Sequence, residues 1–235
     1  MSQQTAATRH KNFYRKLDDI LRHIDEEEGL ESMITGILSR VADHVLGEED
    51  ALSSGRLYRR DGDDYVIVRS FGARGEKLLG ERVSATYGVF EKLQAHTVNY
   101  FFPDDDLYDA EIEDRLGVAA FAAFYIGADR QYVAAFGIDD GADLNEVMLT
   151  LNALRYAISH RLKEVSLEGQ LREARDIQLS LLPRRMPDFA GYDIAAESIP
   201  AEEVGGDLLD LIEVSPDLLA IAVGDASGHG LPAAL

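Results

Sequence analysis

Hydrophobic residues in the first 45 positions recur with the spacing of two amphipathic helices. One stripe lies within residues 1–29 and the other spans residues 30–45, and Gly29 separates them. Steps of three and four residues place each stripe on a single helix face. The stripes consist of Phe13, Leu17, Ile20 and Ile24, and of Met33, Ile34, Ile37, Leu38, Val41 and Val45.

Between residues 55 and 139 the pattern predicts mainly short strands. GRLYRRDGDDYVIVRSFG predicts two strands joined at Asp-Gly, because that pair favours the positive φ angles of a hairpin turn. GERVSAT and TVNYFF predict two more strands, YGVFEKLQAH between them predicts a short helix, and the acidic residues 103–114 predict a solvated loop. VAAFAAFYI and QYVAAFGID, joined at GADR, predict a central, buried hairpin.

A helical pattern then continues from Leu144 to Pro183. Its apolar positions form two runs with coiled-coil steps, and the register shifts between Val165 and Leu167. Gly169 follows the shift and weakens the helix by about 1 kcal/mol relative to alanine. We expect a parallel dimer through this helix, with a lone helix that caps the preceding domain as the alternative. The runs are Val147, Leu151, Leu154, Ile158, Leu162 and Val165, then Leu167, Leu171, Ala174, Gln178 and Leu181.

Three strands are predicted after Pro183, over residues 192–198, 208–214 and 218–223. Ser-Pro-Asp makes the turn between the last two, so these strands form an antiparallel hairpin. Asp207 opens the hairpin and Asp225 closes it at a similar distance from the turn, so their carboxylates can approach each other. Neighbouring carboxylates need a proton or a cation between them, and Mg²⁺ and Mn²⁺ favour oxygen ligands.

The composition narrows the classes of protein that fit. Hydrophobic residues make up 46% of the 235 residues, which is enough for a core. With 23 basic and 43 acidic residues the net charge is −20, which disfavours nucleic acid and anionic membranes as partners. The chain has no cysteine, and it has no apolar run near 18 residues, so neither a disulfide nor a membrane span is expected. We expect a cytoplasmic protein.

The element order of residues 30–165 resembles that of a GAF domain. The resemblance lies in the order of elements and in their apolar pattern rather than in a short motif. It implies an α+β fold, with helices packed on an antiparallel sheet, and a pocket for a small-molecule ligand. Phe101, Phe102, Phe121 and Phe124 are candidates to line that pocket, although aromatic residues on strands more often form plain core. The absence of cysteine excludes a thioether-linked bilin.

Three ordered motifs within residues 171–235 carry a second resemblance: ARDIQLSLLP, PAEEVGGDLLD and GDASGHGLPAAL. They resemble the start of a PPM-type (metal-dependent, type-2C-like) protein phosphatase domain, in the branch of the SpoIIE and RsbU serine phosphatases of bacterial stress and sporulation signalling. The resemblance implies two metal ions, Mn²⁺ or Mg²⁺, bridged by Asp225. It also implies that the backbone carbonyl of Ala226 is a further ligand and that Asp207 supports the second metal. Asp225 and Asp207 are therefore the candidate catalytic residues for metal-assisted hydrolysis of phosphoserine or phosphothreonine.

The same family carries further metal-binding aspartates later in its catalytic domain. We therefore expect the sequence to be a piece of a longer protein, and expect this piece to be inactive. The parent would be a sensor-regulated serine/threonine phosphatase whose substrate, by resemblance, is a phosphorylated STAS-type anti-sigma-factor antagonist. The alternative is a non-catalytic, dimeric GAF and coiled-coil scaffold.

The predicted organisation has four parts. Residues 1–29 contain an amphipathic helix, and residues 30–150 form the GAF-like sensor domain. Residues 144–183 form the coiled-coil linker, through which the chain is expected to form a homodimer. Residues 184–235 form the N-terminal fragment of the PPM phosphatase domain and supply the first strands of its β-sandwich.

Overall fold

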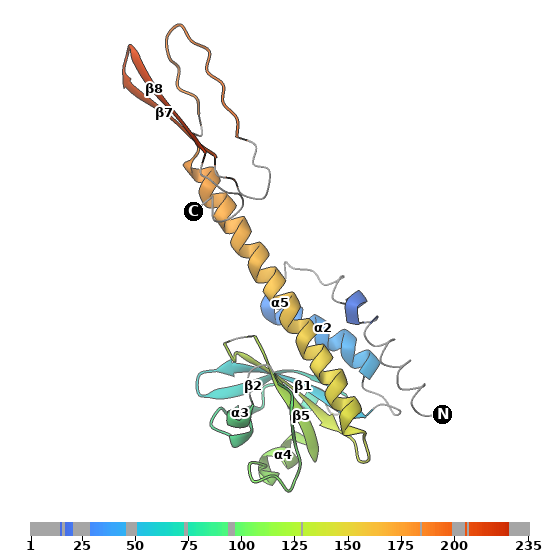
Figure 1. Cartoon of the computed structure of the whole chain (residues 1–235). Coiled ribbons are helices and arrows are strands. Elements are labelled where there is room, and N and C mark those ends of the chain that lie inside the picture. Colours follow the sequence, from blue (N-terminus) through green and yellow to red (C-terminus); the bar gives the residue numbers. More distant parts are fainter. Residues whose placement is uncertain are drawn as a thin grey trace. The chain divides into compact units, whose positions relative to one another are not determined.

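The computed structural model of the chain describes residues 15, 17–20, 29–45, 51–72, 75–93, 97–127, 129–183, 185–198, 205 and 207–225. The chain divides into two compact units, residues 1–162 and residues 163–235. The helices are α2 (Leu30–Val45), α3 (Gly88–Lys92), α4 (Ala110–Leu116), α5 (Leu144–Leu181) and the 3₁₀ helix η2 (Gly75–Leu78). The strands are β1 (Leu52–Asp61), β2 (Asp64–Phe71), β3 (Arg82–Ser84), β4 (Asn99–Phe101), β5 (Ala120–Ile126), β6 (Tyr132–Ile138), β7 (Asp207–Ser215) and β8 (Leu218–Asp225) (Figure 1).

The first unit is built on a six-stranded antiparallel sheet with the order β3-β2-β1-β6-β5-β4. Both predicted hairpins are present. β1 and β2 turn at Gly62, whose φ of +64° is the left-handed conformation that an Asp-Gly turn supplies. β5 and β6 are both interior strands, and all seven residues of β6 are buried. The α+β fold class and the antiparallel sheet predicted from the sequence are confirmed.

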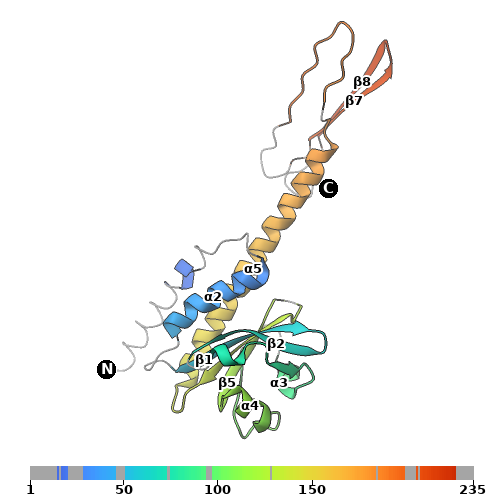
Figure 2. The same ribbon diagram turned by 180° about the vertical axis from the view of Figure 1, so that it is seen from behind.

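Helices cover both faces of this sheet. α2 and the first half of α5 lie on one face, and α3 and α4 lie on the other (Figures 1 and 2). On the α2 side, buried residues include Ile34 and Ile37 of α2 and the stacked rings of Phe124 and Phe136. The core on the α3 and α4 side is a separate cluster that includes Tyr58, Tyr65, Val83, Val89, Phe90, Leu93, Phe101, Leu116 and Phe121.

The first half of α5 belongs to the core of the first unit. Val147, Leu151, Leu154 and Ile158 are all buried there. The prediction that these residues begin a dimer seam was therefore wrong. A three-and-four spacing identifies an apolar helix face, but it does not say whether that face meets the chain's own sheet or another chain.

The acidic residues 103–114, predicted to be a loop, contain most of helix α4. The carboxylate of Asp109 caps this helix by accepting hydrogen bonds from the backbone N–H groups of Glu111 and Ile112. Gly117 ends it in the left-handed conformation, with φ of +70°. The two cap residues were the signal in the sequence, and the density of acidic residues obscured it.

The N-terminal stripe is described only in part. Leu17 and Ile20 lie in a helical segment and are buried, as their spacing predicted, whereas Phe13 and Ile24 lie outside the described residues. None of the helices in the described ranges combines the length and apolar character needed to span a membrane.

The second unit contains the C-terminal part of α5 and the hairpin of β7 and β8. The hairpin turns at Pro216 and Asp217, and Cα pairing runs from Ser215 opposite Leu218 out to Asp207 opposite Asp225. The third predicted strand, over residues 192–198, is not formed. A strand needs a partner for its backbone groups, and in the described part of this unit β7 and β8 pair only with each other.

Candidate functional site

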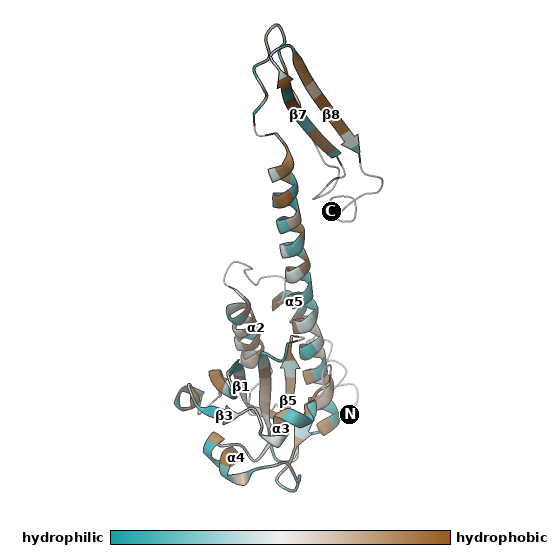
Figure 3. Cartoon of the chain, turned by 90° about the vertical axis from the view of Figure 1, so that its left-hand side faces the viewer, coloured by the Kyte–Doolittle hydropathy of each residue, from teal (hydrophilic) through white to brown (hydrophobic). Residues whose placement is uncertain are grey.

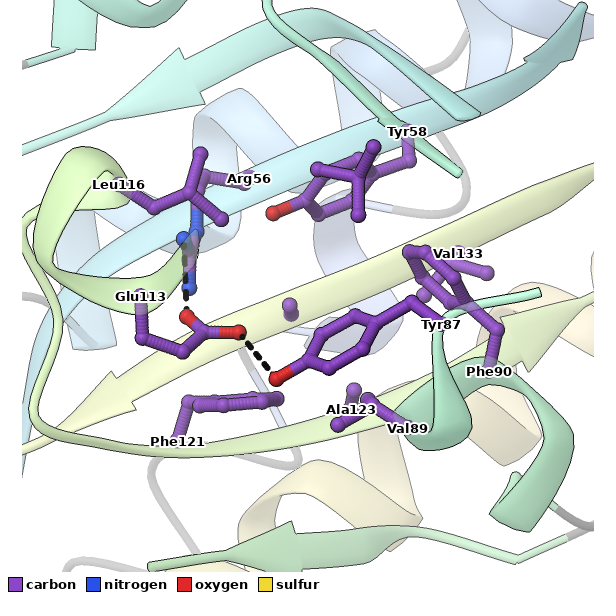
Figure 4. Close-up of a pocket in the computed structure, with 12 residues that line it drawn as sticks. Arg56, Tyr58, Tyr87, Val89, Phe90, Glu113, Leu116, Phe121, Ala123 and Val133 are labelled. Carbon is purple, nitrogen blue, oxygen red and sulfur yellow. Dashed lines mark hydrogen bonds and ion pairs between the residues drawn. The ribbon is translucent and has the colours of Figure 1, made fainter. Parts of the chain in front are cut away.

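A small cavity lies in the first unit between the sheet and helices α3 and α4 (Figure 4). Its volume is about 10 Å³, which is room for about one water molecule. Most of its wall is apolar or aromatic, and four polar side chains reach it. The lining residues are Arg56, Tyr58, Val83, Tyr87, Val89, Phe90, Glu113, Leu116, Phe121, Ala123, Val133 and Ala135.

Arg56 of β1 and Glu113 of α4 form a buried, incomplete ion pair in this cavity. Each residue is 2% exposed. Arg56 Nη1 lies 3.9 Å from Glu113 Oε2, which is too far for a hydrogen bond. Arg56 Nε and Nη1 and Glu113 Oε2 have no hydrogen-bond partner. Buried charged groups are normally both paired and hydrogen-bonded, so these atoms are an exception that needs an explanation.

Tyr87 ties Glu113 to the loop that precedes α4. Its hydroxyl donates to Glu113 Oε1 at 3.2 Å and accepts from the backbone N–H of Asp109 at 3.1 Å. Burial raises the pKa of Glu113 from its usual 4.5 to about 7, an effect that the nearby Arg56 cation and the Tyr87 hydroxyl oppose only in part. The carboxyl of Glu113 therefore changes protonation near neutral pH.

The four phenylalanines predicted to line a pocket differ in their position relative to this cavity. Phe121 lines it, and Phe101 stacks behind Phe121 with ring centroids 5.1 Å apart. Phe124 points to the opposite face of the sheet, because side chains alternate along β5, and it stacks on Phe136. Phe102 is half-buried and does not line the cavity. Plain core thus accounts for Phe101 and Phe124.

Arg56 and Glu113 were missed by sequence reasoning. Arg56 is one of three arginines in β1, with Arg59 and Arg60, so no pattern in the sequence singles it out as the buried one. Glu113 lies in the acidic stretch that predicted a loop. The register of β1 against β6 and the position of the α4 cap bring the side chains of Arg56 and Glu113 together. The sequence does not reveal this contact, because 57 positions separate the two residues.

The second candidate site is the open end of the β7–β8 hairpin. Asp207 and Asp225 are directly opposed across the ladder. Opposed residues in an antiparallel pair point to the same face, with Cβ atoms about 5 Å apart. Both aspartates are exposed. The expected approach of the two strand ends is confirmed. Ala226 lies outside the described residues, and within those residues no group of three or more metal-binding side chains occurs.

Gln178 of α5 binds the backbone just ahead of Asp207. The backbone N–H of Gly205 donates to Gln178 Oε1 at 3.1 Å, and Gln178 Nε2 donates to the carbonyl oxygen of Gly205. The two partners come from two of the motifs, ARDIQLSLLP and PAEEVGGDLLD. One side chain therefore fixes both backbone polar groups of a residue two positions from the candidate metal ligand.

Comparison with solved structures identifies the fold of the first unit. The GAF domain of a phosphoenolpyruvate-protein phosphotransferase from Coxiella burnetii matches with a TM-score of 0.50 at 14% identity, over 70% of this chain and 98% of that chain. The first unit has the GAF fold. The nlh2 GAF domain of A. aeolicus, solved in an inactive state, matches at 13% identity with a TM-score of 0.48, over 67% of this chain and 98% of that chain.

Two curated proteins are similar to part of the chain. Protein IcfG of Synechocystis is 32% identical over 91 residues, which is 39% of this chain and 14% of that protein. Phosphoserine phosphatase RsbU of Bacillus subtilis is 32% identical over 69 residues, which is 29% of this chain and 20% of that protein. The chain therefore matches a fifth or less of each relative's length. No protein-family model matches the chain.

Proposed function

We propose that this chain is part of a sensor-regulated, metal-dependent serine/threonine protein phosphatase. In this proposal the GAF-fold unit is the sensor, α5 is the linker, and residues 184–235 begin the catalytic domain. The observation that carries it is the register of β7 and β8, which sets Asp207 opposite Asp225. The similarity to a phosphoserine phosphatase adds support for the reaction class.

The paired aspartates fit a divalent cation. Residues 207–225 contain no lysine or arginine, so nothing in this hairpin neutralises the two carboxylates. Carboxylate oxygens are the ligands that Mg²⁺ and Mn²⁺ prefer. Asp225 and Asp207 would hold the ions together with the backbone carbonyl of Ala226. Two bound ions would supply a hydroxide nucleophile at neutral pH and stabilise charge on the phosphoryl group.

The substrate in this proposal is a phosphoserine or phosphothreonine of a signalling protein. By the resemblance to the SpoIIE and RsbU branch, that protein is a phosphorylated STAS-type anti-sigma-factor antagonist. The 235-residue chain by itself is expected to be inactive, because two carboxylates and one carbonyl are too few ligands to fix two ions.

Substitution of Asp225 in the full-length protein tests the proposal. We expect Asp225→Asn to lower Mn²⁺-dependent hydrolysis of a phosphoserine substrate at least about 100-fold, because the variant would lose a carboxylate proposed to hold the metal. Asp217→Asn is the matched control, since Asp217 is an exposed aspartate in the turn of the same hairpin. Equal activity of both variants would remove Asp225 from the site. A full-length protein without metal-dependent activity would favour the non-catalytic scaffold.

We also propose that α5 forms a dimer through its exposed apolar residues. The large ones are Leu149, Tyr156, Leu167, Ile177 and Leu181, with Leu179 outside the pattern. Successive members of this set are 7, 11, 10 and 4 residues apart, and each spacing is a sum of the three- and four-residue steps of a heptad. This set therefore keeps its register between Val165 and Leu167. The register shift in the apolar pattern of the sequence arises because its first part, Val147 to Ile158, packs in the core of the first unit. Sedimentation as a monomer at tens of micromolar would contradict this dimer.

A further inference from the structure

Helix α5 bonds through one side chain to the segment that leads into strand β7. The backbone N–H of Gly205 donates to Gln178 Oε1 at 3.1 Å, and Gln178 Nε2 donates to the carbonyl oxygen of the same residue. A glutamine amide has both an acceptor and donors, so it can pair with both polar groups of one backbone residue. We call these two hydrogen bonds the Gln178–Gly205 clamp.

The clamp lies just beyond the end of the β7–β8 ladder. In the described part of the chain, Cα pairing ends with Asp207 opposite Asp225, and Gly205 lies two residues beyond that last pair. The ends of a two-stranded ladder open easily, because such a sheet is only marginally stable and its terminal pairs fray first. Gln178 therefore bonds the backbone next to the part of the hairpin that is least constrained by strand pairing.

The face of α5 that carries Gln178 is covered by the folded chain. Ala174, one turn earlier on this face, is 8% exposed and Gln178 is half-buried, whereas Ile177 beside it is 51% exposed. The heptad spacing places Gln178 in the seam expected for a dimer, but its amide bonds to the backbone of its own chain. Gln178 is thus set apart from the exposed apolar residues of α5.

We propose that Gln178 is a positioning residue for the metal site formed by Asp207 and Asp225. It acts through the backbone of Gly205, two residues ahead of Asp207, and it does not itself bind a metal ion. The proposal deepens the proposed phosphatase function and rests on it, because it concerns the affinity of that site for its ions. The three residues that carry it and Gly205 all belong to the second unit.

The strand ladder makes one anchor sufficient for both aspartates. Asp225 is held opposite Asp207 by the pairing of β8 with β7, so an anchor at the start of β7 also sets the position of Asp225. The ligands of a metal site must be held to within about 0.5 Å of their productive arrangement. Both carboxylates are exposed, so burial does not hold them. Without the clamp, the pair would move more freely relative to α5, and its affinity for metal would fall.

A purely stabilising role for Gln178 would give a different experimental result. A loss of stability alone lowers the fraction of folded protein, which circular dichroism measures, and leaves the affinity of the folded molecules for Mn²⁺ unchanged. A loss of positioning raises the dissociation constant of the folded protein for Mn²⁺. Activity would then return as the Mn²⁺ concentration is raised.

Gln178→Met in the full-length protein tests the proposal, with Gln170→Met as the matched control. Gln170 is an exposed glutamine of the same helix whose amide donates to the side chain of Ser166, one turn earlier. Calorimetric titration should give a dissociation constant for Mn²⁺ about tenfold higher in Gln178→Met, as for other residues that orient metal ligands, and unchanged in Gln170→Met. The rate of hydrolysis at saturating Mn²⁺ should stay within about threefold of the wild type.

The possible failures of this test are distinguishable. Unchanged Mn²⁺ affinity in folded Gln178→Met would overturn the positioning role and leave the phosphatase proposal standing, whereas a full-length wild type that binds no Mn²⁺ would overturn both. Hydrogen exchange in the 235-residue chain tests the clamp without any metal. The amide of Gly205 should exchange at least about tenfold faster in Gln178→Met than in the wild type, and an equal rate would contradict the clamp.

Gln178→Glu keeps the proposal testable if Gln178→Met does not fold. Its carboxylate still accepts from the N–H of Gly205, but it cannot donate to the carbonyl oxygen of Gly205. The added negative charge by itself favours a nearby cation. We expect weaker Mn²⁺ binding than in the wild type, because the loss of position outweighs the added charge. Equal or tighter binding would refute the positioning role.

Discussion

The two units of the chain use similar strands in different ways. β6 of the first unit and β8 of the second are both apolar strands of antiparallel hairpins that the sequence predicts by the same signals. Every residue of β6 is buried, whereas Ile221 and Val223 of β8 are 60% and 79% exposed. Figure 3 shows hydrophobic colouring along most of β8 and along parts of β7.

The difference shows that hairpin formation and core formation are separate events. β6 pairs on both sides and has helices over both faces of its sheet, so its side chains are removed from water. In the described part of the second unit, β7 and β8 pair only with each other. A two-stranded sheet is marginally stable without a third strand or a packed layer. The first unit is therefore held by its core, and the second by its strand ladder and by polar contacts such as Gln178 with Gly205.

The sharpest test of this contrast uses one substitution in both units. Ile67 of β2 is 1% exposed and Ile221 of β8 is 60% exposed. Ile67→Ala should lower the free energy of unfolding of the first unit by about 2–5 kcal/mol, because it opens a cavity in a packed core. Ile221→Ala should change the same quantity by no more than about 0.5 kcal/mol. Urea denaturation of the two variants measures both, and similar losses would mean that β8 is covered after all.

The buried Glu113 makes the stability of the first unit depend on pH. Its pKa is raised from 4.5 to about 7, so the folded state holds this proton more tightly than the unfolded state. The resulting stability is fully present below pH 4.5 and is lost as pH rises to about 7; the difference is on the order of 3 kcal/mol. The unfolding free energy of the wild type, relative to Glu113→Gln, should therefore fall between pH 5 and pH 8.

Glu111→Gln serves as the control for this pH effect, because Glu111 is an exposed glutamate on the same helix α4. Its profile should run parallel to that of the wild type. If the Glu113→Gln profile is also parallel, the carboxyl of Glu113 is not the group that titrates in this window.

The smallest expected effect concerns the linker helix. A Cβ added at Gly169 of α5, or at Gly36 of α2, would meet no atom within 4 Å. Gly→Ala at either position should stabilise its helix by about 0.5–1 kcal/mol, since alanine loses less backbone entropy. Hydrogen exchange should show slower opening around residue 169 in Gly169→Ala. In the full-length phosphatase proposed above, only Gly169→Ala should shift basal activity; an unchanged activity in both variants would make α5 a passive tether.

Much of the local structure follows from the sequence because its causes are local. The apolar stripe after Gly29 gives α2 its bounds at Leu30 and Val45, and Asp-Gly and Ser-Pro-Asp fix the turns of two hairpins. The pairing of Asp207 with Asp225 follows in the same way, because a short turn sets the register of everything beyond it. The order of residues along the chain is thus enough to bring the two candidate metal ligands together.

Only the tertiary structure determines which apolar faces are buried in the core and which charged side chains lie close together. The spacing of Val147, Leu151 and Leu154 marks a helix face, but only packing shows that this face is buried in the first unit. Arg56 and Glu113 meet because β1 and α4 converge at one cavity, although 57 residues separate them in the chain. The periodicity of apolar residues indicates which side of a helix or strand is buried away from water. The partner on that side, and the desolvation that gives a buried carboxyl its raised pKa, exist only once distant segments have packed.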